Sequence, residues 1–284
     1  MTFLSFLFQF ADGAAFLVLA SMGLAVIFGM MGVINLAHGE LITLGAYVMV
    51  ACVRRGVPFL GAVLTAAFAT GLVGALIEAL VIRRLRGRLQ DSVVATWGIS
   101  LLVTQGLLIA AGPTMPAIGT PFGSVAFGGI TVPAYRLVLI GVAACLLLAA
   151  WLVYRHTRAG IHARAAVQRP DIAVALGLHV GRVHTTTFAV GAALAGLAGA
   201  LYAPTMTVVP TMGSAFVIQS FVTVVVGGAD VFAGMVPAAA VLALAQTGLA
   251  AKYGALIGQI GLLVAVIFVV RLMPRGISGA LLRE

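Results

Sequence analysis

Charged residues are scarce in this chain of 284 residues, at 8% of the total, and only seven of them are acidic. An ordinary globular domain carries about 25% charged residues. Hydrophobic residues, by contrast, make up 62% of the sequence. So little charge on so apolar a chain excludes a soluble fold of this length, because a soluble domain needs more polar surface than this composition supplies.

Cysteine and histidine are also rare and scattered. Cys52 and Cys145 both lie in apolar runs without CxxC spacing, so we expect two buried thiols that pack as small hydrophobic groups, and no disulfide. Four of the five histidines fall within residues 155–184 and show no ligand spacing. We therefore expect no metal site.

The short motifs of nucleotide and hydrolytic chemistry are missing. The chain has no GxxxxGKS or GxxxxGKT sequence, and so no P-loop with which to bind ATP itself. HExxH and GxSxG are absent as well. We expect neither enzyme activity nor a cofactor, and a membrane enzyme would need a catalytic pair that the sequence does not show.

Long apolar runs dominate what is present. A helix needs about 20 apolar residues to cross a bilayer. Six uncharged runs approach that length: residues 13–34, 92–112, 137–154, 185–203, 231–251 and 253–270. A seventh run, 57–82, contains only Glu78, and segments 36–53 and 216–229 are less regular. The sequence predicts an all-α, polytopic transmembrane helix bundle with about eight spans, including broken or short helices, in one domain over residues 1–284.

The net charge of +9 could suit nucleic acid, but the basic residues cluster between apolar runs, as the positive-inside rule predicts. The clusters lie in segments 83–88, 155–182 and 271–283. We place all three in the cytoplasm, which makes 216–229 a crossing and puts the N-terminus outside. Nucleic acid is thereby set aside as a partner. The first eleven residues lack Lys and Arg, so they lack the basic region of a signal peptide and we expect them to be retained.

Two apolar segments contain polar residues flanked by glycine. In GMMGVINLAHGELITLG, from residue 29, Gly32 and Gly39 bracket polar residues that are costly at membrane depth and usually face a pathway; these are Asn35, His38 and Glu40. In the segment 208–234 the corresponding candidates are Gln219, Ser220, Gly227, Gly228 and Asp230. GVINLAHG and GGADVFAG share one pattern: Gly, two residues, Asn or Asp, Leu or Val, two residues, Gly. Interrupted apolar segments at corresponding places in the two halves of a transporter indicate a central site.

Each segment also has a plainer interpretation. His38 and Glu40 would be a solvated turn if this point lies at the inner surface. Asp230 would simply cap the helix that follows it. The small-residue run 191–200, GAALAGLAGA, is typical of a helix contact within the membrane.

The segment 155–184 predicts a short helix outside the membrane. Pro170 and Asp171 suit a first helical turn, and Gly177 suits the end. We expect a helix over 170–176 with Ile172, Ala173 and Leu176 on one face, suited to docking into a separate motor subunit. An amphipathic helix on the bilayer surface is the alternative. The segment 115–133, rich in Gly and Pro, predicts an external loop.

Several stretches resemble one family. GLAVIFGMMGVINLAHGELITLGAYV, ARAAVQRPDIAVALGL, GLAGAL, VVVGG and LMPRGISG are similar to the permeases of branched-chain amino acid ABC importers, the LivH and LivM type. The resemblance covers nearly the whole chain. ATWGIS and GSAFVIQSFVTVVVGG look more like the urea and short-chain amide permeases.

The resemblance implies an alternating-access permease of the bacterial inner membrane. Its implied partners are a second homologous permease subunit, cytoplasmic ATP-binding subunits, a periplasmic or extracellular solute-binding protein and membrane lipid. It also implies that the helix near Pro170 is the coupling helix, although Ala165, Ala166 and Gly177 match the family's loop only partly. The residues carried over as the ATPase contact are Arg164, Arg169, Pro170, Asp171, Ile172, Leu176 and Gly177. The competing hypothesis is a stand-alone secondary transporter or channel with His38 and Glu40 as a proton relay.

Overall fold

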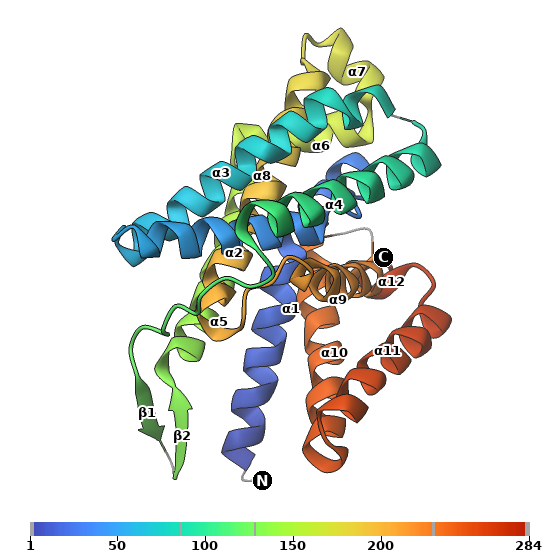
Figure 1. The fold of residues 1–284 in the computed structure, drawn as a ribbon. Coiled ribbons are helices and arrows are strands. Elements are labelled where there is room, and N and C mark those ends of the chain that lie inside the picture. The colour runs from blue at the N-terminus through green and yellow to red at the C-terminus, as the bar shows by residue number, and fades with distance from the viewer. Residues whose placement is uncertain (1–2, 86, 128, 229–230, 282–284) are drawn as a thin grey trace. The chain divides into compact units, whose positions relative to one another are not determined.

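The computed structural model describes residues 3–85, 87–127, 129–228 and 231–281. Figure 1 shows the elements along the chain. The first half contains α1 (Phe3–Met31), α2 (His38–Arg54), α3 (Phe59–Leu80), the 3-10 turn η1 (Ile82–Leu85), α4 (Leu89–Ala111), β1 (Ser124–Phe127) and β2 (Ile130–Pro133). The second half contains α5 (Ala134–His156), α6 (Arg158–Gln168), α7 (Pro170–Ala175), α8 (Val180–Tyr202), η2 (Ala203–Thr205), α9 (Met212–Gly227), α10 (Val231–Tyr253), α11 (Ala255–Leu272) and α12 (Gly276–Leu281).

Seven helices in the described part of the chain are long and apolar enough to cross a membrane. They include α1, α3, α4, α5, α8, α10 and α11. Helices α2 and α9, with 17 and 16 residues, are the two less regular segments of the sequence. The polytopic, all-α membrane bundle predicted from the sequence is confirmed, and short helices are part of it.

Helix α1 begins ten residues before the predicted span 13–34 and includes the charged Asp12. Asp12 forms an ion pair with Arg136, at the start of α5. A paired charge is far less costly near a membrane than an isolated one. Requiring a run without any charged residue therefore placed the beginning of this helix too late.

The segment 115–133 contains more regular structure than a loop. Strands β1 and β2 form an antiparallel hairpin in which Val125 pairs with Val132 (Figure 1). Gly129 in the turn has a φ of +82°, a conformation that glycine adopts without steric cost. The sequence prediction missed this hairpin because four-residue strands give little periodic signal.

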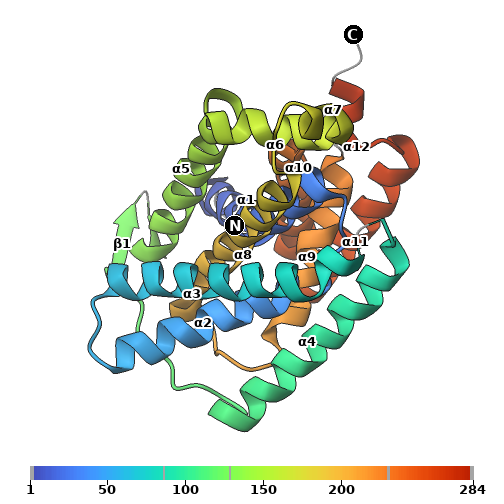
Figure 2. The ribbon, with the colours of Figure 1, turned by 90° about the horizontal axis from the view of Figure 1, so that it is seen from above.

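The chain divides into two compact units, each made of segments that are separated in the sequence. Unit 1 comprises residues 1–21, 120–148 and 219–284, and unit 2 comprises residues 22–119 and 149–218. In unit 2, α8 packs against both α2 and α3, and Figure 2 shows α2 and α3 running side by side. In unit 1, α10 packs against α11 and α12.

Glycines make the packing of α8 close. A methyl group added at Gly199 would overlap the carbonyl oxygen of Ile42, and one at Gly196 would overlap the side chain of Thr70. The run 191–200 is therefore a helix contact, as the sequence predicts. In a membrane such close approach provides the dispersion contacts that apolar burial cannot supply.

The prediction of two buried thiols is wrong. Cys145 in α5 is exposed, while Cys52 in α2 is half-buried. An apolar run in a membrane protein does not determine which face is buried, because the face toward lipid is equally apolar.

Candidate functional site

The chain is interrupted between α1 and α2, where the sequence places its first candidate segment. Gly32 has a φ of +62° and its N–H donates to the carbonyl oxygen of Phe28 at 2.8 Å. A glycine in this left-handed conformation is a common helix end. The following residues leave the helix, and α2 starts at His38.

Asn35 organises the interruption. Its side chain is fully buried, and its Oδ1 accepts from the N–H of Ala37 at 3.1 Å. The N–H of Leu36, between these two residues, donates to Oγ1 of Thr96 in α4 at 3.1 Å. Among the described residues, Asn35 Nδ2 has no hydrogen-bond partner. The Oδ1 atom of Asn35 therefore stabilises the local backbone, and the buried Nδ2 atom is a donor that can bind another group.

Glu40 lies in the first turn of α2 and is 5% exposed. Its Oε1 accepts from the hydroxyl of Thr104 in α4 at 3.4 Å, a long contact, and its Oε2 has no partner in the described part of the chain. Tyr47, seven residues later on the same helix face, also buries a hydroxyl that has no partner there. His38 is completely buried at the start of α2.

Gly39 lets another backbone approach the start of α2. A methyl group at Gly39 would overlap the carbonyl oxygen of Gly213, near the start of α9. The helix break at Gly32 and the close backbone approach at Gly39 are thus both present. Asn35 is buried where the backbone departs from regular helix, an arrangement tolerated at membrane depth only inside protein or beside a water-filled path.

The second candidate segment lies mostly in unit 1. Helix α9 ends at Gly227, and Gly228 has a φ of +88°. Ser220 is fully buried and donates to the carbonyl oxygen of Ala20 in α1 at 2.8 Å, so its hydroxyl joins two helices. Gln219 is half-buried. Asp230 falls outside the described residues.

The two interruptions are alike in kind but not residue for residue. The shared spacing in the sequence aligns Gly32 with Gly227, whereas the left-handed glycines are Gly32 and Gly228. The residues of the first segment belong to unit 2 and those of the second to unit 1. Each group is therefore a local arrangement described by itself.

The predicted helix at Pro170 is present as α7, in unit 2. Pro170 occupies its first turn with Asp171. At its end the N–H of Gly177 donates to Val174 and that of Leu178 to Ala173, and Gly177 has a φ of +83°. This pair of hydrogen bonds is the Schellman motif. The end of this helix was predictable because Gly177 is a local signal, and Pro170 is an equally local signal for its beginning.

The expected single face of α7 is wrong in one respect. Ala173 is buried, whereas Ile172 and Leu176 are 50% and 78% exposed. The small side chain of Ala173 faces the rest of unit 2, and the larger apolar side chains remain uncovered by this chain. Val174, at 59% exposed, adds to this apolar surface.

The arginines near α7 differ in their contacts. The guanidinium of Arg164 in α6 donates to the carbonyl oxygen of Tyr154 and lies 5.0 Å from the centroid of the Tyr154 ring, so it fastens α6 to the end of α5. Arg169 is exposed between α6 and α7.

Helix α6 itself was not predicted; it is capped by Thr157, whose Oγ1 accepts from the N–H of Gly160 at 3.2 Å.

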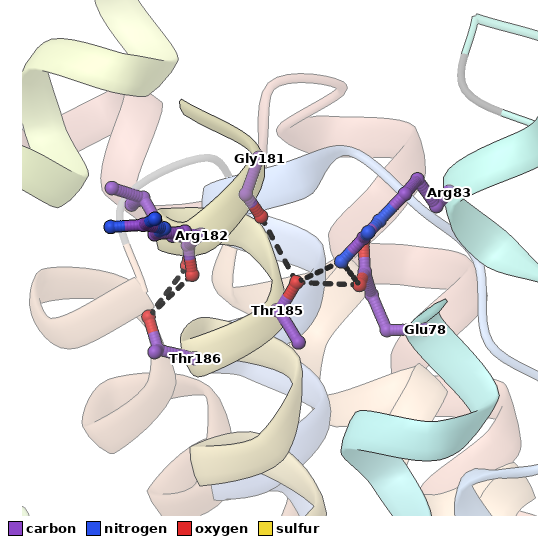
Figure 3. A network of polar contacts seen from close by, with 7 residues as sticks. Glu78, Arg83, Gly181, Arg182, Thr185 and Thr186 are labelled. Atoms are coloured by element: carbon purple, nitrogen blue, oxygen red, sulfur yellow. Dashed lines mark hydrogen bonds and ion pairs between the residues drawn. The ribbon is translucent and has the colours of Figure 1, made fainter. Parts of the chain in front are cut away.

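Sequence reasoning also missed a polar cluster in unit 2, formed by Glu78, Arg83 and Thr185 (Figure 3). The signal was a single acid in the otherwise uncharged run 57–82, followed by an arginine five residues later. The partner Thr185 is 107 residues away and could not be inferred from spacing.

Among the described residues, no group of three His, Cys, Asp or Glu side chains could hold a metal ion.

Comparisons with known proteins show what this chain is similar to. Residues 6–273 match the model of the family described as branched-chain amino acid transport system / permease component. The chain is 27% identical to the high-affinity branched-chain amino acid transport system permease protein LivH of Escherichia coli K12, over 98% of this chain and 96% of that one. It is 25% identical to the permease protein BraD of Pseudomonas aeruginosa, over 92% and 91%.

A probable LivH of Methanocaldococcus jannaschii is 26% identical, over 93% of this chain and 88% of that protein. No solved structure matches. Together with the seven long apolar helices in the described residues, the relatives support a multi-pass protein of the bacterial inner membrane. Because the family match extends over nearly the whole sequence, the chain belongs to the permease component family of branched-chain amino acid transport systems.

Proposed function

We propose that this chain forms the translocation path of an ATP-driven importer for branched-chain amino acids or related small polar solutes, such as urea and short amides. Both units together would make one permease domain. The observation that carries the proposal lies in the interruption between α1 and α2 and in the first turn of α2, where a buried amide nitrogen and a buried carboxyl oxygen have no partner among the described residues.

Buried polar atoms without a partner are costly, about 1–3 kcal/mol each, and at membrane depth they mark substrate pathways. Asn35 supplies a donor, Glu40 an acceptor and Tyr47 a hydroxyl that can do either. A solute that carries both N–H groups and carbonyl or carboxylate oxygens would satisfy them. Amino acids, urea and amides share that chemistry.

The energy for accumulation would come from other subunits, because the chain has no P-loop. The uncovered apolar side chains of α7 are suited to dock into a cytoplasmic ATP-binding subunit. A second homologous permease subunit would complete the path, and a solute-binding protein would deliver the substrate. Opening would alternate between the two sides of the membrane as the ATPases close and separate.

Uptake in cells that lack the chromosomal copy of this gene tests the proposal. Cells that carry the gene on a plasmid should take up radiolabelled leucine, or radiolabelled urea, and cells with an empty plasmid should not. Glu40→Gln replaces an acceptor oxygen by a donor, so uptake should fall about tenfold, the effect of one lost hydrogen bond with a buried group left unpaired.

Asp91→Asn is the matched control, since it makes the same change of acid to amide in an exposed ion pair with Arg88, and such pairs contribute little. It should leave uptake near the wild-type rate. Equal uptake by Glu40→Gln and wild type would remove Glu40 from the path. Plasmid-borne wild type that transports neither probe would contradict the proposed substrates.

A further inference from the structure

A buried carboxylate joins the end of α3 to the beginning of α8 (Figure 3). The Glu78 side chain is 0% exposed, and its Oε2 lies 3.2 Å from Nη2 of Arg83. The hydroxyl of Thr185 donates to the same oxygen at 2.7 Å and accepts from Arg83 Nη2 at 2.8 Å. We call these three residues the Glu78 cluster.

The geometry makes the three residues depend on one another. An acid in the last turns of a helix meets the negative end of the helix dipole, and a fully buried carboxylate needs both a charge partner and hydrogen bonds. Arg83, on η1, supplies the charge. Thr185, on α8, supplies the proton that points at the carboxylate, while the carbonyl oxygen of Gly181 lies farther away at 3.0 Å.

A short stretch of chain connects α7 to Thr185 of the Glu78 cluster. Thr185 follows Gly177 by eight residues, in the second turn of α8. Both α6 and α7 pack against α8. A displacement of α7 therefore reaches Thr185 through a short, largely helical segment.

The Glu78 cluster also lies next to an apolar core. Phe188, one turn after Thr185, packs with Ile82 and Ile27, and all three are at most 1% exposed. Partly buried side chains packed against this core come from the end of α1, the interruption and α3: Met31, Val33 and Ile77. Val33 directly follows Gly32, so the packed side chains extend from α8 into the interruption between α1 and α2.

We propose that the Glu78 cluster is the positioning contact through which movement of α7 changes the interruption between α1 and α2, an inference that rests on the proposed function. The cluster binds α8 to α3, and the core beneath it includes the last turns of α1. Helix α7 and the interruption thus belong to one packed body. Without the cluster, the first turns of α8 would be joined to α3 by apolar packing alone, so a displacement of α7 would reach α3 and the end of α1 less completely.

The test is the amount of solute transported per ATP hydrolysed. The importer would be purified through a tag on this chain, with the subunits that accompany it, and reconstituted in liposomes with radiolabelled leucine as the probe. Thr185→Val removes the hydroxyl at nearly constant volume, and leucine transported per ATP should fall about tenfold, within the range of measured coupling effects. ATP hydrolysis itself should continue.

Two variants of the same helix are the controls. Thr185→Ser retains the hydroxyl and should restore the wild-type ratio. Thr186→Val makes the same substitution at a neighbouring exposed residue, whose hydroxyl, within the described part of the chain, bonds only to the carbonyls of Arg182 and Val183 in its own helix. This variant should also keep the ratio. If Thr185→Val fails to fold, Arg83→Lys replaces it, because it keeps a positive charge beside the buried Glu78 and removes the guanidinium that also donates to Thr185.

A merely structural role would lower transport and ATP hydrolysis together and leave their ratio unchanged. That result, in a variant with a wild-type unfolding temperature, would overturn the inference while wild type still shows ATP-driven uptake. If wild type itself shows no ATP-driven uptake, the proposed function fails and the inference fails with it.

Discussion

Gly39 and Gly213 show how single residues set the distance between backbones in unit 2. Each would place an added methyl group against the main chain of the other. The backbone at Gly39 cannot move away freely, because α2 also packs against α8 through Gly45 and Gly196. Substitution at this point therefore strains packed helices rather than one flexible side chain.

Gly39→Ala should destabilise the chain by about 1–3 kcal/mol, the usual cost of overpacking. Gly98→Ala, in the middle of α4, is the matched control, because nothing lies within 4 Å of the added methyl group. It should stabilise the helix by about 0.5–1 kcal/mol. Thermal unfolding of the purified chain in detergent should thus shift in opposite directions, and equal shifts would contradict the close approach.

The sequence indicated Asn35, His38 and Glu40 as candidates because polar residues in an apolar run are conspicuous. It could not assign their partners. The contact of Glu40 with Thr104 spans 64 residues, and that of Glu78 with Thr185 spans 107. Such pairings depend on which helices pack together, and hydrophobic runs of nearly equal composition carry no information about their neighbours.

Among the elements, α7 was the most predictable and α6 the least. Pro170 and Gly177 are local signals whose effect depends on the backbone alone. The cap at Thr157 is equally local, but it lies among basic residues that we interpreted as a loop. The β1–β2 hairpin was missed for a similar reason, since Gly and Pro dominate its surroundings.

Replacing Ile172 and Leu176 together by Ser should weaken binding of the ATP-binding subunit, because both side chains are exposed and apolar. Burying each of them fully would contribute about 1.5–3 kcal/mol, so the amount of ATPase that co-purifies with the tagged chain should drop severalfold. The folded chain itself should lose little stability, since neither side chain is buried within it.

Val167→Ser in α6 is the control for this pair. Val167 is also an exposed apolar residue of the same segment, at 44%, but it lies outside α7. If Val167→Ser and the double variant release the ATPase equally, α7 is not the specific docking element.

For the whole molecule, composition and charge clusters determined the class of protein. The run lengths predicted the long helices well, because a bilayer imposes nearly the same length on every span. The contact of Arg83 with Thr185 brings the first basic cluster beside the end of the second, which agrees with their placement on one side. The division into two units was not visible in the sequence, since no polar linker separates them.

In the proposed function, this subunit forms the passage and ATP bound to other subunits drives transport. The most direct measurement is leucine accumulation in liposomes that contain the purified importer, with ATP either enclosed or omitted and the solute-binding protein added outside. Leucine should accumulate only with ATP, and a protonophore should have no effect. Accumulation without ATP that a pH gradient drives and a protonophore abolishes would contradict the proposed function, and would favour a carrier that uses His38 and Glu40.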